Sequence, residues 1–113
     1  MNVKTDSVGG IGIVRVGETR LMYPILSDFS NAVAGLVSAG KKDILIDMTP
    51  VTYVDSATIG CLMDLYRQAN AAGGALKLAG VQKRVETMLT MTGAQNFIEI
   101  HPDEPSAVKS FGV

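Results

Sequence analysis

Apolar and polar residues follow two different periods along this chain, one typical of strands and one typical of helices. Residues 44–48 are almost uninterruptedly apolar, which is the pattern of a strand covered on both faces. From Ile59 onward, apolar residues recur every three or four positions, and polar residues occupy most positions between them. The pattern therefore predicts a buried strand that leads, through a turn at Pro50, into an amphipathic helix.

The same two periods predict strands and helices in alternation over the rest of the chain. The expected strands cover residues 3–6, 11–16, 43–48, 52–54, 75–79 and 97–100, and a hairpin containing Gly9 and Gly10 joins the first two. The expected helices cover residues 24–39, 57–72, 82–91 and 104–111. Right-handed crossovers put the first two helices on the same side of the sheet. We predict one α/β domain over residues 1–113, a sandwich with a mixed sheet of about four or five strands and helices packed mainly on one side.

Composition and charge narrow the function classes. The formal net charge is −1, charged residues make up 19% of the chain, and lysines and arginines are scattered or paired. These features leave no electrostatic basis for binding nucleic acid or an anionic membrane. No window has the apolar length of a membrane span, and the N-terminus lacks the pattern of a secretion signal. We therefore expect a cytoplasmic protein.

The sulfur-containing residues indicate packing rather than chemistry. Cys61 is the only cysteine, so the chain forms no internal disulfide and offers no metal-binding framework. We interpret Cys61 as a small buried residue. Four methionines are expected to face the core: Met48, Met63, Met88 and Met91.

Ser56 lies at the predicted N-terminus of helix 57–72, directly after Asp55. The first backbone N–H groups of a helix have no partners within the helix and lie at the positive end of its dipole. They can bind a phosphate carried by Ser56, or they can be capped by the Ser56 hydroxyl or the Asp55 carboxylate. The local pattern is compatible with a phosphorylation site and with an ordinary helix cap.

Three segments resemble the STAS domain of bacterial anti-sigma-factor antagonists. Residues 45–60 resemble the family's strand with a terminal aspartate, its turn and its Asp-Ser motif. Residues 73–81 are similar to the family's glycine pair and third core strand, and residues 85–94 to the helix that ends in a Thr-Gly-apolar sequence. The segments occur in the family's order and cover about two-thirds of the chain. The resemblance implies a STAS-type sandwich.

The resemblance also implies a function, which is partner switching. The unmodified protein would bind an anti-sigma factor that is also a serine kinase, and would thereby release a sigma factor for transcription. Phosphorylation of Ser56, the family's phosphoacceptor position, would end this binding, and a serine phosphatase would restore it. Phosphoserine adds about two negative charges at a packed surface, which opposes complex formation. The resemblance implies no catalytic residue, metal or cofactor for this chain, since ATP and magnesium belong to the kinase.

We expect the partner to bind the surface around Ser56. The expected contact residues come from the turn before the helix, the first helical turn and the loop after the second strand: Thr52, Tyr53, Asp55, Ala57, Thr58, Arg20 and Tyr23. Arg20 stands where many members of the family have an aspartate, so we expect Arg20 and Tyr23 to tune the choice of partner. Thr58 stands where the motif usually has glycine. We expect it to be a first-turn residue that faces solvent, with a role as a second phosphoacceptor as the alternative.

Two other functions are alternatives to partner switching. A hydrolase that uses Ser56 as its nucleophile needs a nearby base, but His101 is the only histidine and follows the last predicted strand. A STAS scaffold or ligand-sensing module that is not regulated by phosphorylation is the stronger alternative, because Arg20 and Thr58 depart from the family pattern. The alternatives differ in whether Ser56→Asp changes binding while folding stays intact.

Overall fold

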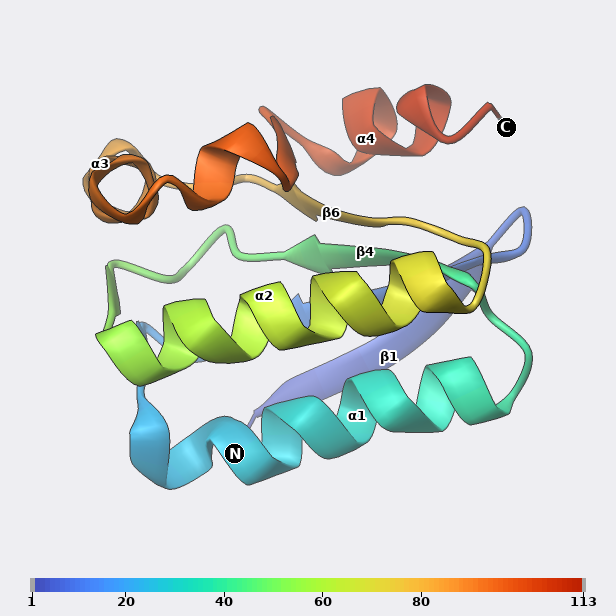
Figure 1. Cartoon of the computed structure of the whole chain (residues 1–113), viewed down its shortest axis with the longest axis horizontal. Helices are drawn as coiled ribbons and strands as arrows, with labels where there is room; N and C mark the ends of the chain where they lie inside the picture. The colour runs from blue at the N-terminus through green and yellow to red at the C-terminus, as the bar shows by residue number, and fades with distance from the viewer. Residues whose placement is uncertain (1, 113) are drawn as a thin grey trace.

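A five-stranded mixed sheet organises the chain. The computed structural model describes residues 2–112. Strands β1 (Val3–Val8) and β2 (Ile11–Val16) form an antiparallel hairpin, and the sheet continues in parallel through β4 (Asp43–Asp47), β6 (Leu76–Ala79) and β7 (Glu99–His101). The strand order is β1-β2-β4-β6-β7. Figure 1 shows β4 between β1 and β6. The prediction of a mixed α/β sheet is confirmed.

The hairpin between β1 and β2 turns on two glycines. Gly9 and Gly10 have φ values of 55° and 86°, and glycine adopts two successive positive φ values at little cost. Strand β1 extends to Val8, two residues further than predicted, because the turn needs only the two glycines.

The helices observed in residues 2–112 agree closely with those predicted. They are α1 (Leu26–Ser38), α2 (Ser56–Ala71), α3 (Lys83–Thr92) and α4 (Glu104–Ser110), with 3-10 turns η1 (Tyr23–Ile25) before α1 and η2 (Ala94–Asn96) after α3. Helices α1 and α2 lie side by side on one face of the sheet, as right-handed crossovers require (Figure 1). Between them, Ser30 Oγ lies 3.1 Å from Cys61 Sγ, and Cys61 is half-buried. No helix in the described part of the chain is long and apolar enough to cross a bilayer.

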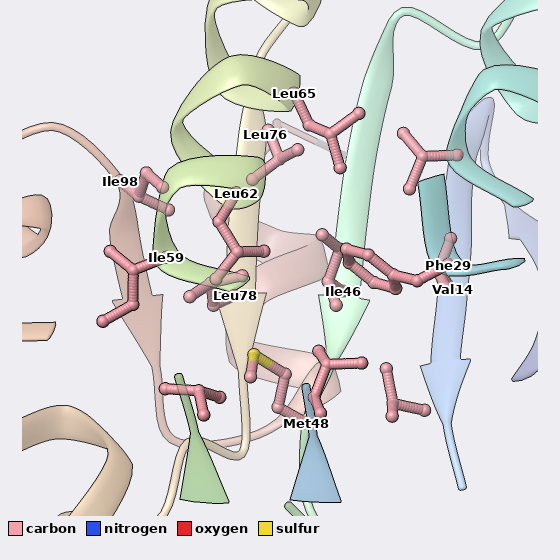
Figure 2. Close-up of a cluster of buried hydrophobic side chains, with 14 of the residues drawn as sticks. Val14, Phe29, Ile46, Met48, Ile59, Leu62, Leu65, Leu76, Leu78 and Ile98 are labelled. Atoms are coloured by element: carbon pink, nitrogen blue, oxygen red, sulfur yellow. The ribbon is translucent and has the colours of Figure 1, made fainter. Parts of the chain in front are cut away.

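The two faces of the sheet bury two separate groups of apolar side chains. Alternate residues of a strand point to opposite faces, so Ile44 and Ile46 belong to a large cluster with residues of α1, α2 and α3. Leu45 belongs instead to a smaller cluster with residues of α4. Figure 2 shows Phe29 of α1 and Leu62 of α2 in the large cluster, which also contains Ile46. The helices therefore pack mainly on one side of the sheet, as predicted.

The prediction for the methionines is only partly confirmed. Met48 is fully buried, and Met63 and Met88 are half-buried against the large cluster. Met91 is 82% exposed, so the expectation that it faces the core is wrong. It follows the buried Leu89 by two positions, which places it on the opposite side of α3.

Charged side chains fasten α4 to the sheet. The Lys77 side chain is only 9% exposed, and its Nζ donates to the carbonyl oxygen of Ser110 at 3.1 Å and to its hydroxyl at 2.9 Å. The same Nζ lies 3.4 Å from Glu99. At the start of α4, the Arg15 guanidinium binds both carboxylate oxygens of Glu104, at 2.8 and 2.9 Å. The contacts with Ser110 and Glu99 provide partners for the buried Lys77 ammonium group, which would be unfavourable without them.

Candidate functional site

The turn that follows β4 is held by side-chain hydrogen bonds. Asp47, the last residue of β4, accepts from the Thr49 N–H at 2.9 Å and from its hydroxyl at 2.5 Å. Gln82 donates to the Thr49 carbonyl oxygen at 2.7 Å. Gly80 leaves room for this turn, since a Cβ at this position would clash with Thr49 Oγ1. The direction in which the chain leaves the sheet is therefore fixed.

A second, two-stranded parallel sheet brings a distant loop next to the start of α2. Strand β5 (Tyr53–Val54) pairs with β3 (Arg20–Leu21), and the Thr52 N–H donates to the Thr19 carbonyl oxygen at 2.7 Å. The sequence did not predict β3, because two residues are too few to show a period. This pairing puts the loop after β2 beside the turn before α2 (Figure 1).

Ser56 is the first residue of α2, and its side chain is exposed, as is that of Ala57. Within residues 2–112, the Ser56 hydroxyl makes no hydrogen bond, and the backbone N–H groups of Ser56 and Ala57 have no acceptor. Asp55 supplies the cap instead, since its Oδ1 accepts from the Thr58 N–H at 2.8 Å. The hydroxyl of Ser56 is therefore not needed to cap the helix.

The Asp55 carboxylate joins the start of α2 to the loop after β3. Its Oδ1 accepts from the N–H and the hydroxyl of Thr58, at 2.8 and 2.6 Å, and its Oδ2 accepts from the Tyr23 N–H at 2.9 Å. Partial burial raises the pKa of Asp55, but the hydrogen bonds from the Thr58 hydroxyl and from the amides of Tyr23 and Thr58 outweigh this effect, so the pKa lies below its ordinary value. Asp55 is therefore ionised at neutral pH.

Thr58 does not face solvent. Its side chain is fully buried, and its hydroxyl lies 2.7 Å from the Leu21 carbonyl oxygen and 2.6 Å from Asp55 Oδ1. The expectation of a solvent-facing side chain is therefore wrong. It failed because the residue that Thr58 contacts lies 37 positions away in the sequence. In this conformation neither a partner nor a kinase reaches the Thr58 hydroxyl.

Strand β3 and the turn that follows it display a cationic side chain, Arg20, and an aromatic side chain, Tyr23, near the start of α2. The Arg20 guanidinium carbon lies 4.8 Å from the centroid of the Tyr53 ring, and its Nε lies 3.4 Å from Met22 Sδ. Tyr23 is 74% exposed, while Thr52, Tyr53 and Asp55 are half-buried. Thus the predicted contact residues other than Thr58 gather on one surface around Ser56, held by β3–β5 pairing and by Asp55.

A serine nucleophile requires a base that is hydrogen-bonded to its hydroxyl. No base is hydrogen-bonded to Ser56 in the described residues, and His101 ends the edge strand β7, where its Nε2 lies 3.1 Å from Glu99 Oε1. Within residues 2–112, no cluster of His, Cys, Asp and Glu side chains is suited to hold a metal ion. The geometry provides an exposed serine beside a carboxylate, on a surface that displays Arg20 and Tyr23.

Comparison with known proteins gives consistent results. The sequence pattern of the STAS domain family matches residues 2–107. An anti-sigma-B factor antagonist from Staphylococcus aureus is 21% identical over 101 residues, which is 89% of this chain and 93% of that protein. An anti-sigma factor antagonist from Mycobacterium paratuberculosis has a similar structure, with a TM-score of 0.88 and 14% identity over 99% of this chain and 94% of that chain. The Bacillus cell fate determinant SpoIIAA in its phosphorylated form matches with a TM-score of 0.73 and 14% identity, over 96% of this chain and 98% of that chain. At these identities the structural likenesses show a shared fold.

Proposed function

This chain belongs to the STAS domain family, and from this membership we propose that it is an anti-sigma-factor antagonist that acts by partner switching. In the proposed cycle the unmodified chain binds an anti-sigma factor that is also a serine kinase. Phosphorylation of Ser56 ends the binding, and a serine phosphatase restores it. In this cycle the chain is a binding protein rather than an enzyme.

The observation that supports this proposal most directly is that Asp55, and not Ser56, caps α2. Asp55 caps α2, and the exposed Ser56 hydroxyl has no hydrogen-bond partner among the described residues. A kinase can therefore reach the hydroxyl without breaking a contact that holds the fold. A phosphorylated form is also known for the structurally similar SpoIIAA, which supports the same chemistry here.

The charges at the site give a physical reason for phosphorylation to oppose binding. Phosphoserine adds about two negative charges at neutral pH. Asp55, the preceding residue, is already ionised and already occupies the Thr58 amide. Only the amides of Ser56 and Ala57 remain for the phosphate, so much of its charge stays at the surface beside another anion. A partner that packs on this surface must then desolvate and face that charge.

The surface around Ser56 is the proposed contact for the anti-sigma factor. Arg20 and Tyr23 supply the cationic and aromatic groups that protein interfaces favour, and Thr52 and Tyr53 lie beside them on the β5 side. Ala57 presents a small side chain next to Ser56. We propose that Arg20 selects a partner with an acidic residue opposite it.

Phosphorylation in a purified system tests the proposal. The chain is incubated with magnesium-ATP and each anti-sigma factor of the serine-kinase type from the source organism, and phosphate is located by fragment mass spectrometry. Wild type should gain one phosphate on Ser56, and Ser56→Ala should gain none. Ser7→Ala, which removes an exposed serine of β1, is the matched control and should behave as wild type. Phosphate on another residue, or equal labelling of Ser56→Ala, contradicts the proposal.

A further inference from the structure

Thr58 is a buried polar residue in a place where an apolar residue of the same size would fit. It is fully buried in the first turn of α2, and apart from Lys77 it is the only buried polar or charged residue in the part of the chain that the structure describes. Burying a hydroxyl is unfavourable unless it is hydrogen-bonded. The contacts of Thr58 therefore indicate why a hydroxyl is present.

The Thr58 hydroxyl lies between two acceptors from different segments. The Leu21 carbonyl oxygen is 2.7 Å away and Asp55 Oδ1 is 2.6 Å away, so the single hydroxyl proton is donated to one of them or shared. The other oxygen of the same carboxylate accepts from the Tyr23 N–H. Leu21 thus contacts Thr58 directly, and Tyr23 is bound to the first turn of α2 through Asp55.

We infer that Thr58 is a positioning residue, whose hydroxyl holds the loop segment 20–23, which begins with β3 and carries Arg20 and Tyr23, against the first turn of α2. Loop and helix then present Arg20, Tyr23 and Ser56 as one preorganised surface, which lowers the entropy lost when a partner binds. The inference rests on the proposed function only for the identity of that partner. The fastening itself is a property of the free chain.

A pair of variants, one isosteric with threonine and one that keeps its hydroxyl, tests this link between loop and helix without any partner. Thr58→Val fills the same space but has no hydroxyl, whereas Thr58→Ser keeps the hydroxyl and loses only a methyl group. NMR measures two quantities on each free variant: the pKa of the Asp55 carboxyl, and the exchange rate of the Tyr23 amide relative to core amides of β4. Urea denaturation measures the global stability of each variant in parallel.

The inference predicts a local change in Thr58→Val and little change in Thr58→Ser. Loss of the hydroxyl should raise the pKa of Asp55 towards its ordinary value, because one of the hydrogen bonds that lower it is gone. The Tyr23 amide should exchange about tenfold faster relative to β4, as expected for the loss of one hydrogen bond to a charged group. If Thr58→Val does not fold, Thr58→Ala removes the same hydroxyl and leaves a smaller side chain. Exchange of the Tyr23 amide that stays unchanged, or that rises equally at Tyr23 and in β4, overturns the inference.

Partner affinity provides the second arm of the test. Where wild type binds an anti-sigma factor, Thr58→Val should bind about tenfold more weakly and Thr58→Ser should bind within about twofold of wild type. Equal affinities of Thr58→Val and wild type overturn the role of this link in preorganising the surface. Failure of the proposed function appears differently, as a wild-type chain that binds no anti-sigma factor, and the NMR comparison then still decides whether Thr58 fastens the loop.

Discussion

Replacement of Asp55 by alanine should remove the carboxylate whose hydrogen bonds to Thr58 and to Tyr23 hold the site together. The carboxylate caps the Thr58 N–H and also accepts from the Tyr23 N–H, 32 residues away. Loss of a helix cap costs about 1 kcal/mol, and loss of the second hydrogen bond to a charged group costs about 1 kcal/mol more for a partly exposed carboxylate. Asp55→Ala should therefore lower the free energy of unfolding by about 2 kcal/mol at pH 7. For a chain of this size that moves the urea midpoint by about 1 M.

The pH dependence of this loss follows from the lowered pKa of Asp55. A carboxyl whose pKa is lower in the folded state than in the unfolded state stabilises the fold above the unfolded pKa, and this contribution disappears as the pH falls through the folded pKa. The difference between wild type and Asp55→Ala should be constant from pH 7 to about pH 5 and should shrink below the ordinary value of 3.8. Asp55→Asn keeps an acceptor for the cap without the charge, so its loss of stability at pH 7 should be smaller than that of Asp55→Ala. Its difference from wild type should also shrink below pH 3.8, because the group that titrates is the wild-type carboxyl.

A second capped helix in the same chain provides the control. Asp103 caps α4 through the Ser106 N–H at 2.9 Å, and its exposed carboxylate makes no hydrogen bond to a distant loop among residues 2–112. Asp103→Ala should therefore cost less stability than Asp55→Ala in urea denaturation followed by circular dichroism. The reasoning is refuted if the two variants lose the same stability at pH 7, or if the loss in Asp55→Ala is as large at pH 3 as at pH 7.

Three further predictions concern the packing that supports the site, and each is read from urea denaturation. Leu62→Ala should lower the free energy of unfolding by about 3 kcal/mol, because Leu62 is fully buried between α2 and the sheet, and a loss below about 1 kcal/mol would contradict this account of the core. Lys77→Ala should lower the free energy of unfolding by about 2 kcal/mol, because the hydrogen bonds to Ser110 are lost. It should also make α4 more sensitive to proteolysis, and unchanged cleavage would contradict the role given to Lys77. Gly80→Ala should lower the free energy of unfolding more than Gly40→Ala. Both glycines have positive φ values (68° and 92°), but of the two only position 80 would bring a Cβ against another residue, Thr49. Equal losses of stability would contradict the close approach of Gly80 to Thr49.

The elements of the fold could be predicted because each has a long and regular pattern. The apolar run at residues 44–48 and the repeating apolar positions after Ile59 depend on local sequence, and they correspond to β4 and α2. Strand β3 could not be predicted in this way, because it has two residues and forms only by pairing with β5. The exposure of Met91 does not follow from its apolar side chain, because a residue two positions after the buried Leu89 lies on the opposite side of α3.

The candidate site could be predicted only as far as its local parts. The position of Ser56 at a helix start follows from the sequence that surrounds it, and the structure agrees. The burial of Thr58 depends on the Leu21 carbonyl, and the second contact of Asp55 depends on the Tyr23 amide. Both contacts cross more than 30 residues of sequence, so no local pattern announces them. They exist because β3–β5 pairing brings the loop to the helix.

The most direct test of partner switching compares one chain in two chemical states. The chain is phosphorylated stoichiometrically at Ser56, purified, and titrated by calorimetry into the anti-sigma factor beside the unmodified chain, with a phosphatase-treated sample as the control. The account predicts that the phosphorylated chain binds at least about 100-fold more weakly and that phosphatase treatment restores the affinity. Equal affinity of the two states would contradict the account, and would mean that this STAS domain serves as a scaffold or a ligand-sensing module.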